Sequence, residues 1–197
     1  MNIYEKKYER KNLNRIIHTT LNPDNPGVVR IHLVPSKFSL FKSRPSIVIL
    51  NGKDIIPLNS AWAILLSIFI DEVNEHKGNE ISDEQLEEIV NITIQKLKKI
   101  YKFAKLETIK ADLWNMMNLF NAISNKEETD IDVGQISIGD FAKFMKAPHR
   151  MDLMISSMKK DNKWNCNQKC MHCYAANQDY AETRELTTDE WKKIIDI

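Results

Sequence analysis

The pattern of apolar and polar positions predicts a strand-rich segment early in the chain. Apolar and β-branched residues concentrate at Val28–Leu33 and at Pro45–Leu50, which predicts two strands. Asn51-Gly52 follows the second strand at once and predicts a tight hairpin turn, because both central residues of such a turn need a positive φ. Asp54–Leu58 is then expected to be the returning strand.

Three helices are expected after these strands. A strongly apolar stretch begins at Asn59 or Ser60, either of which can cap a helix that runs to about Val73. A helix that is apolar on all sides is expected to be buried. Ser82 and Gln85 have the spacing of a capping box for a second, amphipathic helix. An apolar stripe at helical spacing predicts a third helix from about Leu106 to Ser124.

The two ends of the chain are less regular. Residues 1–27 predict a mobile arm or a short helix followed by a loop, because Asn, Pro and Gly are dense at residues 22–27. Residues 126–148 are expected to be a linker, in which Ile136–Met145 fits a short strand or an amphipathic helix equally well. Met151–Ser156 predicts a buried strand, and Thr187 with Glu190 predicts the start of a last helix.

Charge and apolar run lengths exclude several classes of function. The 197 residues contain 28 basic and 27 acidic side chains, so the chain lacks the cationic excess typical of nonspecific nucleic-acid binding. The longest apolar run, Ala61–Ile70, is far shorter than the roughly 20 residues that cross a bilayer. The N-terminus has no apolar segment typical of a secretory signal. We therefore expect a cytoplasmic protein with neither nucleic acid nor membrane as a partner.

The three cysteines carry the most specific chemistry. Cys166, Cys170 and Cys173 have the spacing C-x3-C-x2-C and are the only cysteines in the sequence. An odd number this close together is a poor disulfide framework and favours metal binding. Thiolates are soft donors that suit iron, and a set of three leaves one iron of a [4Fe–4S] cluster open to another ligand.

In the form Cys-Asn-x-x-Cys-x-His-Cys-Tyr, this segment resembles the signature of the radical SAM superfamily. The resemblance covers about Met151–Ile197 and implies the first βα unit of a partial (β/α) barrel. It implies that the three cysteines hold a [4Fe–4S] cluster whose fourth iron binds S-adenosylmethionine. Reduction of that cofactor would release a 5′-deoxyadenosyl radical that abstracts hydrogen from a substrate. His172 takes the place before the last cysteine that is usually aromatic and lies near the adenine in the family, and Tyr174 matches the aromatic residue that often follows. Both are expected to contact the cofactor, and the alternative is that either packs against the loop.

The earlier part resembles the PqqD-like winged-helix domain that recognises peptides in radical SAM enzymes acting on ribosomally made peptides. This resemblance implies a leader peptide or another peptide or protein as substrate, added as a strand to a sheet edge. It implies Val28–Leu33 or Ile47–Leu50 as that edge. A ferredoxin or flavodoxin is the implied electron donor.

These observations together predict an α+β fold and a radical SAM function. The expected organisation is an arm at 1–27, a winged-helix-like domain at 28–125, a linker at 126–148 and the start of a truncated barrel at 149–197. We expect the chain to be the front part of a longer enzyme and to be inactive alone. The alternative is a non-catalytic winged-helix binding module in which the cysteines and a histidine form a Cys3His zinc site.

Overall fold

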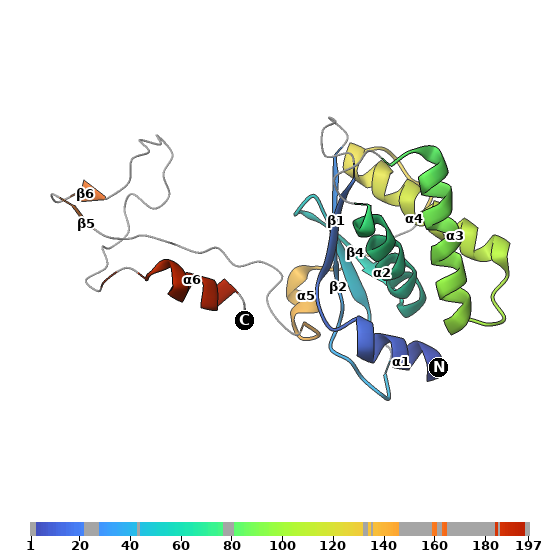
Figure 1. The fold of residues 1–197 in the computed structure, drawn as a ribbon, viewed down its shortest axis with the longest axis horizontal. Helices are drawn as coiled ribbons and strands as arrows, with labels where there is room; N and C mark the ends of the chain where they lie inside the picture. The colour runs from blue at the N-terminus through green and yellow to red at the C-terminus, as the bar shows by residue number, and fades with distance from the viewer. Residues whose placement is uncertain are drawn as a thin grey trace. The chain divides into compact units, whose positions relative to one another are not determined.

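A computed structural model describes residues 3–21, 28–42, 44–76, 81–131, 134, 136–145, 159–160, 163–164, 184 and 186–195. The chain divides into two compact units, residues 1–149 and residues 150–197. The first unit is an α+β domain in which helices pack on a four-stranded antiparallel sheet (Figure 1).

The sheet is a simple meander in which each strand pairs with its neighbours in sequence. Its strands, in spatial order, are β1 (Ile17–Leu21), β2 (Val29–Val34), β3 (Ser46–Leu50) and β4 (Asp54–Leu58). The predicted hairpin between β3 and β4 is confirmed. Asn51 and Gly52 have φ values of 49° and 76°, and Lys53 N–H donates to Leu50 O at 3.0 Å. The three strands expected from the sequence are therefore present as β2, β3 and β4.

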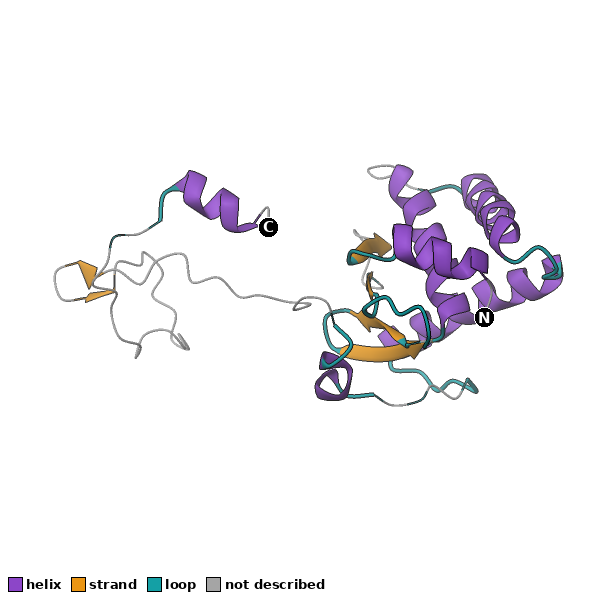
Figure 2. Cartoon of the chain, turned by 90° about the horizontal axis from the view of Figure 1, so that it is seen from below, coloured by secondary structure: helices purple, strands orange, loops and turns teal. Residues whose placement is uncertain are grey.

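Three helices cover one face of the sheet, as Figure 2 also shows from below. They are α2 (Ser60–Glu75), α3 (Asp83–Ile100) and α4 (Leu106–Asn125). The predicted caps are confirmed: Asn59 Oδ1 accepts from Trp62 N–H at 2.9 Å, and Ser82 forms a complete capping box with Gln85. These side chains satisfy backbone N–H groups that have no partner within the helix, which fixes where α2 and α3 begin.

The core lies between the sheet and the apolar α2 helix. Side chains that alternate along the strands point into it, and α2 lies across all four strands. The fully buried aliphatic core residues include Ile31, Leu33, Val48, Leu50, Ile64, Leu66 and Ile70. Because α3 and α4 pack on its remaining sides, α2 is buried nearly all round, as its composition predicts.

For residues 3–21, the short helix that was one of the two expectations is present, whereas a mobile arm is wrong, and so is a loop at Ile17–Leu21. These residues form α1 (Ile3–Asn12) and the edge strand β1, and both pack on the domain. Leu13 and Ile17 are each only 5% exposed, and the Tyr8 hydroxyl lies 3.1 Å from Ser67 Oγ on α2. The segment is part of the fold because its few apolar residues enter the core.

The predicted linker also contributes to the first unit. Ile138–Ala142 forms the short helix α5, so Ile136–Met145 is helical in part rather than a strand. Phe141 is fully buried and packs with Val34, Ile47 and Ile49 on the face of the sheet opposite α2. Residues 136–145 therefore cover part of that second face instead of linking two domains.

The second unit contains two short strands and one helix among its described residues. These elements are β5 (Lys159–Lys160), β6 (Lys163–Trp164) and α6 (Thr188–Ile195), and the two strands pair antiparallel. The buried strand expected at Met151–Ser156 lies outside the described residues, so that prediction stays untested. Among the described helices, none is both long and apolar enough to cross a bilayer.

Candidate peptide edge and cysteine segment

The predicted cluster ligands lie outside the described residues. This applies to Cys166, Cys170 and Cys173 and to the expected cofactor contacts His172 and Tyr174. The structure therefore neither brings these side chains together nor separates them. Within the part of the chain that is described, no group of three or more His, Cys, Asp or Glu side chains is arranged to hold a metal ion.

The described residues do frame the cysteine segment. The β5–β6 hairpin, Lys159–Lys160 and Lys163–Trp164, precedes it in sequence. After the segment, α6 begins with the predicted capping box: Thr187 N–H donates to Glu190 Oε2 at 2.9 Å, and Glu190 N–H donates to Thr187 Oγ1 at 3.3 Å. The helix α6 therefore begins shortly after the cysteine segment, at Thr188.

The start of α6 is also electrostatically organised. Both terminal guanidinium nitrogens of Arg184 donate to Glu190, Nη2 to Oε1 at 2.6 Å and Nη1 to Oε2 at 2.7 Å. This fork of charge-assisted bonds, together with the Thr187 cap, lowers the pKa of Glu190 to about 2. The carboxylate is therefore ionised throughout the physiological range and stays available as a cap.

The hydrogen bonds of the sheet show which strand groups face outward at β1. Arg30 and Asn51 bond to each other, with 2.9 Å from Arg30 N–H to Asn51 Oδ1 and 2.9 Å from Asn51 N–H to Arg30 O. The backbone of Arg30 is thus directed to the β3 side of β2. The backbone N–H and C=O groups of the alternate β2 residues, which pair with Ile17, Thr19 and Leu21, are directed to β1.

His18 and Thr20 consequently direct their backbone N–H and C=O groups to the open edge of β1. The structure supplies one substitute partner there, because Asn74 Nδ2 of α2 donates to His18 O at 2.9 Å. The other outward groups of this five-residue strand match the spacing at which an added antiparallel strand would bond.

The opposite edge, β4, is less suited to strand addition. The same alternation directs Ile55 and Pro57 outward, and Pro57 has no N–H to donate. Residue 134 also passes beside this edge, since a Cβ placed on Gly134 would lie 3.9 Å from Pro57 Cγ. A proline at an outward position and a covering segment are two ways in which edge strands avoid pairing.

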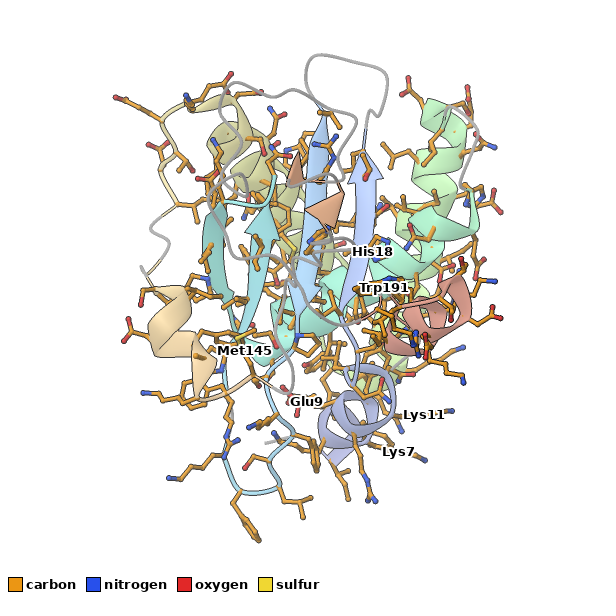
Figure 3. All side chains as sticks on the ribbon, turned by 90° about the vertical axis from the view of Figure 1, so that its left-hand side faces the viewer. Lys7, Glu9, Lys11, His18, Met145 and Trp191 are labelled. Carbon is orange, nitrogen blue, oxygen red and sulfur yellow. The ribbon has the colours of Figure 1, made fainter. Side chains whose placement is uncertain are left out.

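The side chains beside the β1 edge are polar and carry positive charge. Thr20 and His18 of β1 lie opposite Arg30 and His32 of β2, on the sheet face that α5 leaves partly uncovered. The rings of His18 and His32 meet edge to face, with centroids 5.8 Å apart. Figure 3 looks onto this face and labels His18. None of the residues that β1, β2, β3 and β4 direct to this face is an Asp or a Glu.

A charged depression lies on the helix side of the same edge. It has a volume of about 560 Å³ and is lined by residues of α1, α2 and α3 and by Arg15, just before β1. Burial raises the pKa of Asp71, and the nearby Arg15, 3.8 Å away, opposes that rise. Glu72, almost fully buried, is paired with Lys96. Acidic and basic groups here largely neutralise one another.

The two strands predicted to accept a peptide, Val28–Leu33 and Ile47–Leu50, are wrong as edges. They correspond to β2 and β3, which are interior strands because β1 and β4 flank them. Strand β1 was not predicted from the sequence. The signal for it is the β-branched content of Ile17-His18-Thr19-Thr20-Leu21, in which Ile17 and Thr19 prove to be buried and His18 and Thr20 exposed.

No protein-family model, curated protein or solved structure matches this chain.

Proposed function

We propose that this protein is a radical SAM enzyme that modifies a peptide. The observation that carries the proposal is the spacing C-x3-C-x2-C within Cys-Asn-x-x-Cys-x-His-Cys-Tyr. Three clustered thiolates without a fourth cysteine fit a [4Fe–4S] cluster that keeps one iron for another ligand. With S-adenosylmethionine, a cluster of this kind supplies a 5′-deoxyadenosyl radical for hydrogen abstraction.

Five residues of the segment have roles in this proposal. Cys166, Cys170 and Cys173 would hold the cluster as thiolates, which requires that they lose their protons on binding. His172 and Tyr174 would contact S-adenosylmethionine, since His172 takes the family position near the adenine and Tyr174 is the aromatic residue next to the last cysteine. The helix α6 follows the segment in the chain order expected of the first βα unit of a barrel.

The first unit supports a peptide as the substrate class. Three consecutive strands followed by three helices, β2 to β4 and α2 to α4, are similar in order to a winged-helix peptide-recognition domain. The β1 edge offers outward backbone groups at His18 and Thr20, whereas β4 presents Pro57. A peptide bound at β1 would place alternate side chains beside His18 and Thr20, with Arg30 and His32 of β2 one strand further in. The positive charge of Arg30 on this face favours acidic residues at those positions.

Metal analysis tests the cluster part of the proposal. The purified protein is reconstituted anaerobically with iron and sulfide, and its iron, sulfide and zinc contents are measured. We expect about four irons per chain and broad visible absorption, both lost in Cys170→Ala. About one zinc per chain without visible absorption would instead support the zinc-binding module and contradict the enzyme.

A binding assay tests the peptide part separately. The probes are labelled synthetic peptides that alternate Val with Glu, and peptides of equal length that alternate Val with Lys. We expect preferential binding of the acidic peptide. Thr20→Pro removes one outward N–H without removing a ladder bond, so it should weaken that binding about fivefold, the equivalent of one hydrogen bond of about 1 kcal/mol.

Pro57→Val is the matched variant, because it restores an N–H at the opposite edge. If β1 is the accepting strand, this substitution leaves peptide affinity unchanged. If peptide affinity instead increases in Pro57→Val and does not change in Thr20→Pro, the peptide binds at β4. Equal binding of the acidic and basic peptides would contradict the charge argument. None of these outcomes depends on the cluster.

A further inference from the structure

The loop between β2 and β3 combines exposed apolar side chains with positive charge. Leu40 and Phe41 are adjacent at its tip and are 60% and 91% exposed. Lys37 and Lys42 flank them and are also exposed. The loop projects at the end of the domain where α1 also lies, as both Figure 1 and Figure 3 show.

Internal contacts hold the loop in this form. Its two ends are tied by Ser36 Oγ donating to Arg44 O at 3.3 Å, and Lys37 N–H donates to Phe144 O at 2.7 Å. Near the tip, Lys42 N–H donates to Ser39 Oγ at 3.2 Å. These bonds fix the base of the loop, so Leu40 and Phe41 are presented to the outside while the backbone beneath them is bonded.

The charged side chains of the loop itself are all positive. Between Val34 and Ser46 the sequence contains no Asp or Glu and three Lys or Arg residues: Lys37, Lys42 and Arg44. The overall charge is only +1, so most other cations of the chain are balanced by acids, whereas these three have no acidic residue within the loop. Helix α1 lies beside the loop, since Lys6 Nζ lies 5.9 Å from the centroid of the Phe38 ring, and the pair that Lys6 forms with Glu9 adds no net charge there. Glu9, the acidic neighbour, pairs with Lys6 at 2.9 Å.

We propose that this loop docks the protein on an anionic lipid bilayer, with Leu40 and Phe41 inserted at the interface and Lys37, Lys42 and Arg44 at the headgroups. Apolar residues ringed by Lys and Arg are the pattern that interfacial binding requires. The expectation of no membrane partner rested on the lack of a spanning segment and a signal, and surface docking needs neither.

The small apolar area favours a bilayer over a protein partner. One Leu and one Phe side chain offer at most a few hundred Å², well under the roughly 800 Å² that each partner buries in a stable protein interface. A bilayer can bind a protein through so small an insertion because anionic headgroups supply the remaining attraction. The proposal is independent of the cluster and of the peptide edge.

Vesicle co-sedimentation of the full chain tests the proposal. The vesicles are phosphatidylcholine alone, or phosphatidylcholine mixed with phosphatidylglycerol. We expect binding to the mixed vesicles only, weakened by salt. Phe41→Ser should reduce the partition coefficient about tenfold, and each of Lys37→Gln and Lys42→Gln about fivefold. These side chains are exposed, so the folded state should be unaffected, which circular dichroism checks.

Matched controls separate this loop from general surface properties. Phe103→Ser removes a fully exposed aromatic elsewhere, and Lys98→Gln with Lys99→Gln removes charge from α3. These variants should bind like the unchanged protein. Equal loss in the controls, or no binding to the mixed vesicles, would overturn the proposal. Soluble polyglutamate is a further test. If it competes with vesicles for the protein and its binding is unchanged in Phe41→Ser, the partner is an acidic macromolecule and the proposal is overturned.

Discussion

Substituting Phe141 tests whether α5 is a packed part of the first unit. The side chain is fully buried and packs with Val34, Ile47 and Ile49 of the sheet. Its ring lies 6.3 Å from that of Phe144, measured between centroids. Phe141→Ala would leave a cavity between α5 and the sheet, or would release α5 from it.

The expected loss of stability follows from the burial of this ring. Truncation of a buried Phe to Ala costs about 3–5 kcal/mol when the surroundings do not collapse. Helix α5 has only five residues, so it can relax or detach more easily than a central helix, which limits the loss. We therefore expect Phe141→Ala to lower the free energy of unfolding by about 3 kcal/mol, the lower end of that range.

Urea unfolding followed by far-ultraviolet circular dichroism measures this loss by linear extrapolation. Phe103→Ala is the matched control, because Phe103 is fully exposed and its removal should change stability by less than about 0.5 kcal/mol. A loss below about 1 kcal/mol for Phe141→Ala would refute the packing argument. Residues 136–145 would then behave as the linker expected from the sequence, and the whole second face of the sheet would be open.

Two further predictions concern local structure. Gly52→Ala should destabilise the protein by about 1 kcal/mol in thermal or urea unfolding. An added Cβ has free space there, but the φ of +76° is unfavourable for alanine. Gly139→Ala in α5 should be neutral or stabilising, because alanine favours a helix and the added Cβ meets only an ordinary contact. Carbon-detected titration should give the Glu190 carboxyl a pKa of about 2, against an ordinary value of 4.5, and Arg184→Gln should raise it. Since this pKa is lowered in the folded state, the pairing stabilises α6 above pH 4.5 and is lost as pH falls through about 2; a Glu190 midpoint near 4.5 would contradict the fork.

Local signals in the sequence were sufficient for much of the first unit. Asn51-Gly52 predicted the hairpin because few residues other than Gly and Asn adopt positive φ readily. Asn59 and Ser82 predicted helix starts because their side chains can satisfy backbone N–H groups within three residues. Each of these features depends on residues close together in the chain, which is why the pattern alone was enough.

Features that depend on distant residues were not predictable in the same way. β1 becomes a strand by pairing with β2, and Val28–Leu33 therefore lies inside the sheet instead of at its edge. The pattern of Ile136–Met145 fits a strand or a helix equally well, and the segment is decided only when Phe141 packs on the apolar residues of β2 and β3. For the cysteine segment, the prediction comes from the spacing of the cysteines in the sequence alone. Its side chains lie outside the described residues, so the structure does not test it.

The central claim is that three cysteine thiolates leave one iron of a cluster open to S-adenosylmethionine. Electron paramagnetic resonance of the reconstituted and reduced protein tests it most directly. We predict a [4Fe–4S]⁺ signal whose g-values change on addition of S-adenosylmethionine, and which is absent in Cys170→Ala. A signal that S-adenosylmethionine leaves unchanged, or a protein that holds zinc and gives no signal, would contradict the account.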